Sequence, residues 1–337
     1  MNKKYLYLHT DQGGFKNYSF TSDTPKQLTV LSFGGGQDST YILYKIIRDN
    51  GYRAEFVKGR LLVLMSDTGN EHDYTYEHVE FIRRLCFDND IEFYFITPDM
   101  GFHPNTWPSL EYQMIKNNSI MSMMMPRSCT DNLKIKPFYN FLNVWIATEI
   151  YGQSIPNSTR NRKWISKFFA EHGKINVIIG IAAGEEGRVR VSKKSKKASQ
   201  MDMFVKPKKR ESVWMKTCIN RFYPMIIEGI DRQKAQDYIN VTPWPLPWPS
   251  NCTYCPFLTK QELLWMYRLR PKDYQQFVVY EINKLNRNPG VPRNLGVKGM
   301  KYLPEILAEA IKEYGHWTNE QLQEYKMSHG HCVKSKY

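Results

Sequence analysis

The stretch "LSFGGGQDST" (residues 31–40) places three consecutive glycines between an apolar run and an Asp-Ser-Thr triplet. The preceding "QLTVLSF" (27–33) is typical of a β-strand. The following "STYILYKIIRDNGY" (39–52) carries apolar residues at helical spacing up to a stop signal at Asn50-Gly51. No Gly-Lys-Ser/Thr follows the glycines and the spacing is not G-x-G-x-x-G, so neither a Walker loop nor a dinucleotide fingerprint is present. The pattern therefore predicts a strand, a glycine loop and a helix, with a loop that belongs to neither of these two types.

Strand and helix patterns continue to alternate downstream. Strands are expected at "RLLVLMSDTG" (60–69), "IEFYFIT" (91–97) and "KINVIIGIAAGEE" (174–186). Helices are expected at "YTYEHVEFIRRLCFDND" (74–90) and "KIKPFYNFLNVWIATEIYG" (134–152). Such alternation predicts an α/β protein with a parallel sheet flanked by helices on both sides.

The pattern changes towards the C-terminus. "TPWPLPWPS" (242–250) contains four prolines and is expected to be an extended connector. Helical segments follow near 259–269, 271–287, 301–315 and 318–327, whereas residues 100–128 are expected to be irregular. We therefore predict two domains: an α/β nucleotide-binding domain over residues 1–240 and a mostly helical, cysteine-containing module over residues 241–337.

Composition bounds the class of protein. The 337 residues are 42% hydrophobic and 14% aromatic, which excludes wholesale disorder. No apolar run approaches the roughly 18–20 residues that cross a bilayer, and the N-terminal residues lack the pattern of a secretory signal. These features predict a soluble, cytoplasmic protein. Its six cysteines are then metal-binding, redox-active or buried residues before they are disulfides.

The chain is basic, with a formal charge of +14 from 47 Lys/Arg against 33 Asp/Glu. Residues 188–210 contain ten Lys/Arg and a single acidic residue, Asp202. This balance favours a polyanionic partner such as nucleic acid, with the basic segment 188–210 as its predicted contact. The alternative is a solvated, lysine-rich surface.

The glycine loop has the geometry of an anion site. Glycines permit positive φ and close approach of the backbone, and the free amides at a helix start attract phosphate. Ser39 and Thr40 can add hydroxyl donors, whereas Asp38 can cap the helix or hold Mg²⁺. The alternative is a tight strand–helix turn with a capping aspartate.

Residues 34–39 resemble the PP-loop, the S-G-G-x-D-S signature of ATP pyrophosphatases, which cleave between the α- and β-phosphates of ATP. Gly34 replaces the usual first serine and so removes one hydroxyl donor, for which Ser32 is the nearby candidate replacement. Gln37 occupies a position that is often lysine. Four further segments resemble the phosphoadenosine-phosphosulfate reductase and DndC-like branch of that superfamily. They are "SDTGNEHDYTYEHVEFI" (66–82), "RSCTDNLKIKPF" (127–138), "GIAAGEEGRVR" (180–190) and "YPMIIEGIDRQKAQDYI" (223–239) followed by "SNCTYCPF" (250–257).

The resemblance spans roughly residues 28–290 and implies an adenine-nucleotide α-hydrolase-like fold and sulfur-linked chemistry at a nucleotide. Ligands of an open parallel sheet lie beyond the carboxyl ends of its strands, where these segments are expected to converge. The predicted nucleotide-binding residues are Ser32, Gly34, Gly35, Gly36, Gln37, Asp38, Ser39, Thr40, Asp67, Thr68, Gly69 and Glu185. The predicted catalytic residues are Asp38, Lys134, Arg188 and Cys332, with Lys134 and Arg188 as phosphate or sulfate clamps.

Cys252-x-x-Cys255 has the spacing of two thiolates on one metal or cluster. The resemblance implies that Cys129 approaches the same face, which gives three ligands of an iron–sulfur cluster, with Cys332 or an external sulfur species as the fourth. Zinc held by Cys252, Cys255, Cys332 and His329 or His331 is the alternative, and a redox dithiol or buried thiols are further ones. Cys86 and Cys218 lie in apolar surroundings and are expected to be core residues.

Three functions follow from these observations. The first is ATP- and Mg²⁺-dependent adenylation coupled to sulfur transfer on a nucleic acid or nucleotide, with protein partners that supply sulfur or electrons. The second is a sulfonucleotide reductase that binds adenylyl sulfate or phosphoadenylyl sulfate and uses Cys332 as nucleophile. The third is a non-catalytic, nucleotide-gated nucleic-acid-binding subunit.

Overall fold

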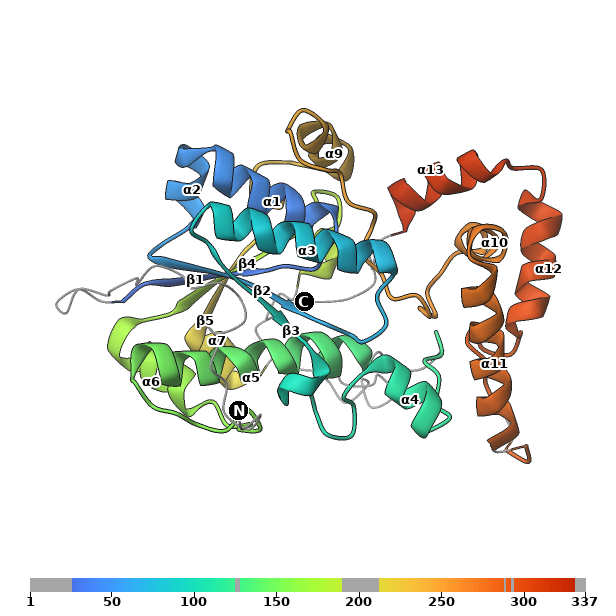
Figure 1. Ribbon diagram of the computed structural model, residues 1–337, viewed down its shortest axis with the longest axis horizontal. Helices are drawn as coiled ribbons and strands as arrows, with labels where there is room; N and C mark the ends of the chain where they lie inside the picture. Colours follow the sequence, from blue (N-terminus) through green and yellow to red (C-terminus); the bar gives the residue numbers. More distant parts are fainter. Residues whose placement is uncertain (1–25, 125–127, 190–211, 288, 292–293, 331–337) are drawn as a thin grey trace, which may run out of the picture.

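A five-stranded parallel sheet forms the centre of the molecule (Figure 1). The computed structural model describes residues 26–124, 128–189, 212–287, 289–291 and 294–330. Within them the strand order is β3-β2-β1-β4-β5, and all neighbouring strands run parallel. The strands are β1 (Leu28–Ser32), β2 (Arg60–Ser66), β3 (Glu92–Ile96), β4 (Ile175–Ile179) and β5 (Ile219–Phe222). The predicted α/β class with a parallel sheet is confirmed.

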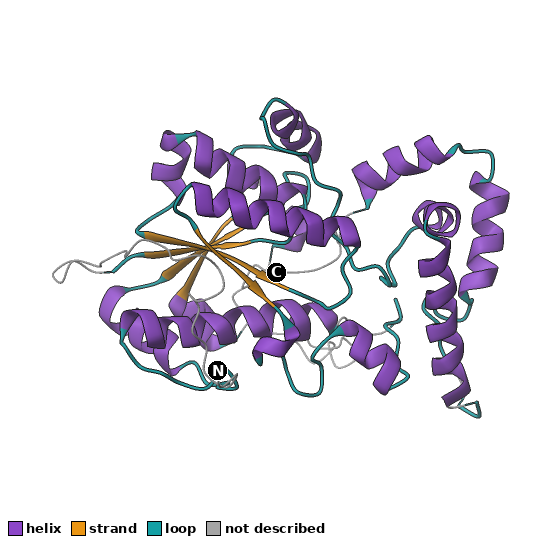
Figure 2. Ribbon diagram, viewed as in Figure 1, coloured by secondary structure: helices purple, strands orange, loops and turns teal. Residues whose placement is uncertain are grey.

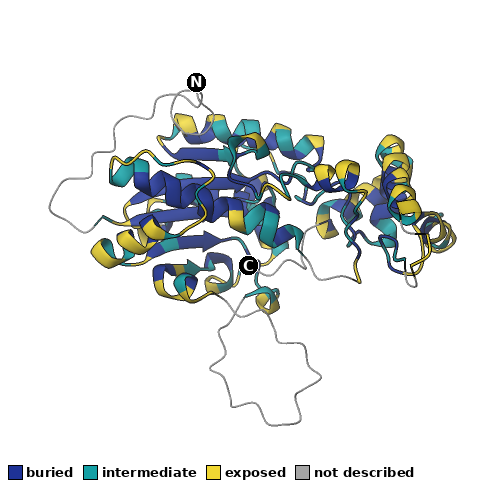
Figure 3. Cartoon of the chain, turned by 90° about the horizontal axis from the view of Figure 1, so that it is seen from below, coloured by how far each residue is buried: buried dark blue, intermediate teal, exposed yellow. Residues whose placement is uncertain are grey.

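Helices cover both faces of the sheet, because successive side chains of each buried strand point to opposite faces. Val30 and Leu62 face one layer, which contains α5 (Lys136–Trp145), α6 (Lys163–His172) and α7 (Val213–Cys218). Leu31 and Val63 face the other layer. That layer contains α1 (Gln37–Arg48), α2 (Asn50–Phe56), α3 (Asp73–Asp88) and α9 (Arg232–Asn240). In Figure 3 the strands are buried and the exposed residues lie on the outer faces of helices.

The C-terminal helices lie beside the sheet and have a core of their own (Figure 2). They are α10 (Lys260–Leu269), α11 (Pro271–Arg287), α12 (Leu303–Tyr314) and α13 (Asn319–His329). Leu264 and Phe277 are fully buried in this core, to which α4 (Leu110–Lys116) also contributes. The helical C-terminal region is therefore confirmed, whereas the division at residues 240/241 stays a prediction. No helix in the described ranges is long and apolar enough to cross a membrane.

Several boundaries differ from the sequence predictions. The first predicted helix is split, because the Asp49 side chain accepts a hydrogen bond from the Tyr52 amide and starts α2 there. Helix α4 lies within residues 100–128, which were expected to be irregular. Helices α6, α7, α8 (Pro224–Ile227) and α9 and strand β5 were not predicted. A π-helical turn, Thr130–Ile135, precedes α5.

Candidate functional site

The glycine loop joins β1 to α1 in a tightly specified conformation. Gly35 has φ +71°, and a Cβ there would lie 3.0 Å from side-chain atoms of both Met65 and Thr75. The Gly34 amide donates to Ser39 Oγ at 3.1 Å, and that hydroxyl donates to the Gly36 carbonyl at 3.1 Å. The Ser250 hydroxyl donates to the Gly34 carbonyl from the C-terminal side of the chain. Glycine is required at residue 35 because a side chain would be both strained and obstructed.

A cavity opens beside this loop, at the point where the chain crosses from β1 to β2 on one side and β4 lies on the other. This is the switch point at which ligands bind in open α/β sheets. Its polar walls include Ser32, Gly34, Gly36, Gln37, Asp38, Ser39, Lys134, Arg188, Arg221 and Arg232. Its apolar walls include Phe138, Tyr139, Val177, Ile179 and Met215. An apolar pocket beside amides and cations suits a planar base with attached phosphates.

Four charged side chains at one wall of the cavity form a network of ion pairs: Asp38, Glu185, Arg188 and Arg232. Glu185 accepts from Arg188 Nη1 at 2.5 Å and from Arg232 Nη2 at 2.8 Å, while Arg232 Nε lies 3.6 Å from Asp38 Oδ1. Burial raises the pKa of the Asp38 carboxyl above its ordinary value, an effect that Arg232 opposes. Glu185 thus orients two arginines toward the cavity.

Close approach of β4 to the loop depends on Gly180. A Cβ at this position would lie 3.0 Å from both Asp38 C and Ser39 N. Gly180 also lines the cavity. The residue therefore lets the end of β4 pack against the start of α1 and close the cavity on that side.

Gln37 connects the glycine loop to distant parts of the chain. Its buried side-chain amide donates to the carbonyls of Pro247, at 3.1 Å, and Met327, at 3.3 Å. Its carbonyl oxygen accepts from Gln236 Nε2 at 2.8 Å. Glutamine at this position thus holds the loop against the connector and α13.

We expect Gln37→Ala to lower the free energy of unfolding by about 1–3 kcal/mol, because it leaves buried partners of the amide unsatisfied. Chemical denaturation of the two proteins measures this difference. The matched control is Gln233→Ala, since Gln233 lies on exposed α9 surface and bonds only Asp237 among the described residues. Equal stability of Gln37→Ala and the parent protein would contradict the connecting role.

A second polar group follows β2. Asp67 Oδ1 accepts from the Gly69 amide at 2.8 Å and from Tyr76 Oη at 3.0 Å, which shapes the turn. Burial raises the pKa of Asp67 to about 6. The Thr68 hydroxyl donates to Glu71 Oε1 at 3.0 Å. Asp67, Thr68 and Gly69 thus shape the turn after β2 through these hydrogen bonds, and none of the three lines the cavity.

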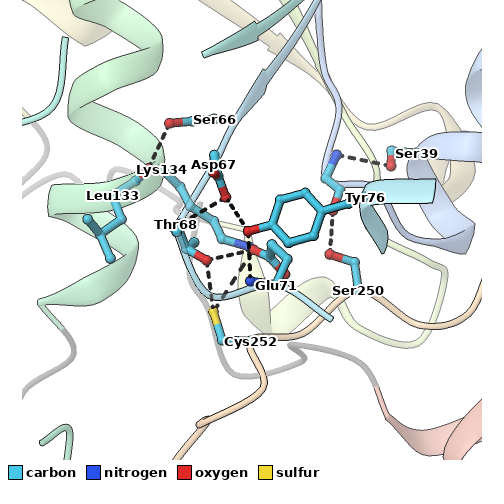
Figure 4. Close-up of polar contacts among 12 residues, drawn as sticks. Ser39, Ser66, Asp67, Thr68, Glu71, Tyr76, Leu133, Lys134, Ser250 and Cys252 are labelled. Atoms are coloured by element: carbon cyan, nitrogen blue, oxygen red, sulfur yellow. Dashed lines mark hydrogen bonds and ion pairs between the residues drawn. The ribbon is translucent and has the colours of Figure 1, made fainter. Parts of the chain in front are cut away.

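The Cys-x-x-Cys segment pairs with this turn (Figure 4). Cys252 forms an antiparallel bridge with Glu71, and the Thr253 amide donates to the Asn70 carbonyl at 2.9 Å. Cys252 Sγ lies 3.5 Å from Thr68 Oγ1 and 4.0 Å from Glu71 Oε1. Burial, and then the Glu71 carboxylate, raise the pKa of the Cys252 thiol well above its usual value.

Lys134 joins the two groups. Its side chain lines the cavity, and its Nζ lies 3.5 Å from Glu71 Oε1 (Figure 4). The π-helical turn that carries it is held to the end of β2, where the Ser66 hydroxyl donates to the Leu133 carbonyl at 2.7 Å. One lysine therefore lines the cavity and also contacts the carboxylate beside Cys252.

Three of the predicted cluster ligands lie within the described ranges. Cys129, Cys252 and Cys255 all pack against the core of the C-terminal helices. Within the described ranges, no three His, Cys, Asp or Glu side chains form a group that could hold a metal ion. Cys332 and His331 lie outside those ranges, and His329 stacks on Tyr325 at 4.3 Å. The cluster and zinc ligand sets therefore stay predictions, whereas Cys86 and Cys218 are buried as expected.

The other predicted residues have distinct positions. The Thr40 hydroxyl bonds His78 Nε2 at 2.9 Å inside the protein and does not line the cavity. Most of the basic segment 188–210 lies outside the described residues, which include only its first two positions. Sequence reasoning missed Glu71, Gly180, Arg232 and Ser250. They lie in segments that resemble the family, but nothing in the spacing of these segments indicates that the four residues meet.

Comparisons with known proteins give few matches. No protein-family profile matches the sequence, and no curated protein is similar to it. One similar solved structure is the U34-tRNA thiolase NcsA from Methanococcus maripaludis with its [4Fe-4S] cluster. The identity is 12% and the TM-score 0.35, over 88% of this chain and 75% of that one.

Proposed function

We propose that this protein uses ATP to adenylate a nucleic acid or nucleotide, and that sulfur then replaces the activated oxygen. The glycine loop and the start of α1 would bind the phosphates through backbone amides and Ser39. The apolar wall of Phe138, Tyr139 and Ile179 would contact the adenine base. Lys134, Arg188 and Arg232 would neutralise charge on the phosphates.

The reaction balances without an oxidant or reductant. An oxygen of the substrate attacks the α-phosphorus of ATP, the bond to the β-phosphate oxygen breaks, and pyrophosphate leaves. Sulfur at the oxidation level of sulfide, delivered by a donor, then attacks the activated carbon. A carbon–sulfur bond forms, the carbon–oxygen bond breaks, and AMP leaves with the oxygen.

Two bound groups accompany this proposal. Mg²⁺, with Asp38 as its candidate ligand, would neutralise the pyrophosphate leaving group. Cys129, Cys252 and Cys255 are the residues proposed to hold an iron–sulfur cluster, which would supply a sulfur-binding metal position; zinc is the alternative. The roles proposed above for the protein side chains are the same whether the cysteines hold an iron–sulfur cluster or zinc.

The position of Lys134 is the observation that carries the proposal. Lys134 lines the cavity and pairs with Glu71, and the same Glu71 oxygen lies 4.0 Å from Cys252 Sγ, so a single carboxylate links the lysine of the cavity to the Cys-x-x-Cys segment. A simple nucleotide-binding subunit gives no reason for a thiol beside the phosphate site. Activation and sulfur delivery at one substrate atom require this proximity.

The test is to incubate the protein with ATP, Mg²⁺, sulfide and either transfer RNA or duplex DNA, and to measure pyrophosphate and sulfur incorporation. We expect pyrophosphate release that depends on one nucleic acid, together with thiolated product. Tight binding of nucleic acid without pyrophosphate release would contradict an enzyme. Release of sulfite from adenylyl sulfate in the absence of ATP would instead identify a reductase.

A further inference from the structure

A second, basic pocket lies outside the site described above. It is lined by Pro104, Asn105, Thr106, Lys136, Asn140, Ser158, Arg160 and Arg162. Three of these residues are cationic and none is acidic. Among the described residues, only Lys136 of the three has a carboxylate partner, Asp131, at 3.4 Å. The two arginines therefore give the pocket a net positive charge that no described side chain neutralises.

Arg160 is held in place by main-chain acceptors. Its Nη2 donates to the carbonyls of Gly101 and His103, both at 2.9 Å, and its Nη1 donates to the Asn157 carbonyl at 2.9 Å. Neutral carbonyls orient a guanidinium but leave its charge available to an anion. Arg160 is exposed, so a ligand can reach it.

Arg162 is more deeply placed. Its Nη1 donates to Asn140 Oδ1 at 2.9 Å, and its guanidinium lies 5.1 Å from the centre of the Trp214 ring. Asn140 is itself fixed, because its Nδ2 donates to the Phe102 carbonyl at 2.7 Å. Burial, and then the charge of Arg160, lower the pKa of Arg162 to about 10. Arg160 and Arg162 thus lie close together, and none of the described carboxylates pairs with either guanidinium, so an anion would stabilise this arrangement.

The pocket and the glycine-loop cavity share one helical segment. Lys134, Ile135, Phe138 and Tyr139 line the cavity, whereas Lys136 and Asn140 line the basic pocket. At 3.6 residues per turn, these two sets lie on different sides of the segment. With side chains a helix is about 10–12 Å across, so one small ligand does not fill both sites.

We propose that the basic pocket binds a backbone phosphate of the nucleic-acid substrate, whose strand passes over the start of α5 from the glycine-loop cavity. This inference rests on the proposed function and specifies the substrate as a polymer. A polymer has repeated phosphates, so one can lie at Arg160 and Arg162 while the reacting nucleotide lies near Lys134. Oriented guanidinium groups are the side chains best suited to phosphate oxygens.

The test measures binding of single-stranded RNA and DNA oligonucleotides by fluorescence anisotropy at several salt concentrations, with ATP affinity measured separately. We expect Arg162→Gln to weaken oligonucleotide binding about tenfold and to reduce the salt slope by about one, because one phosphate contact is lost. ATP affinity should not change. Ser158→Glu places a carboxylate in the pocket at an exposed position, and it should also weaken oligonucleotide binding while the core is untouched.

The controls are Arg84→Gln, which removes an exposed charge on α3, and Ser158→Ala. Both should bind oligonucleotides like the parent protein. Parent-like binding by both Arg162→Gln and Ser158→Glu would overturn the inference. A second result would also overturn the inference. In it, inorganic phosphate competes in the parent protein, Arg162→Gln abolishes this competition, and the affinity for oligonucleotides is unchanged. Such a result would identify a small-anion site. Failure of the parent protein to bind ATP would instead refute the proposed function, and the variants would still decide the role of the pocket.

Discussion

Lys134→Met should reduce the rate of pyrophosphate release by about 10²–10³-fold, the loss typical of one preorganised charge at a reacting group. Methionine keeps the length of the side chain and removes the cation that lines the cavity. It also removes the ion pair with Glu71. The measurement is steady-state pyrophosphate release with ATP and the nucleic acid that supports turnover.

The matched control for this variant is Lys116→Met, because Lys116 is exposed on α4 and does not line the cavity. It should retain parent-like release. Thermal unfolding of both variants shows whether the loss is catalytic or structural. Unchanged release by a folded Lys134→Met protein would show that Lys134 does not stabilise the transferring phosphate.

Cys252→Ser should lower sulfur incorporation by at least about 100-fold and leave pyrophosphate release within a few-fold of the parent value. Serine is nearly the same shape and can still donate to Thr68 and Glu71, so the pairing of the two segments should persist. Oxygen cannot replace sulfur as a soft metal ligand or as a carrier of sulfur. Mass spectrometry of the digested nucleic acid measures the thiolated product.

Cys218→Ser is the control for Cys252→Ser, because Cys218 is a buried thiol in the core around α7 and does not line the cavity. It should retain sulfur incorporation after correction for any loss of folded protein. Continued incorporation by Cys252→Ser would exclude this thiol from sulfur chemistry. Loss of both pyrophosphate release and incorporation would mean that Cys252 is needed for nucleotide binding rather than for sulfur transfer.

The sequence was sufficient to predict a strand or helix where its apolar residues form a clear pattern. The strands around Val30, Val63 and Phe93 are buried on both faces, and continuous apolar runs are typical of such strands. Helix α4 was missed because only a few positions of this short helix are apolar and buried, Leu110 and Met114 among them. Strand β5 was missed because it has only four residues and two of them, the exposed Asn220 and the half-buried Arg221, are polar. Weak periodicity leaves such elements to tertiary packing.

By itself, the sequence determined the alternation of strands and helices, the glycine loop and the type of ligand that such a loop suits. These are properties of neighbouring residues, which spacing and backbone preference report directly. Only the tertiary structure decided that Gln37 binds Pro247 and Met327, that Arg232 reaches Glu185, and that Lys134 lies between the cavity and Glu71. Such contacts join residues far apart in the chain, and they depend on the order of strands in the sheet and on how the connector returns to it.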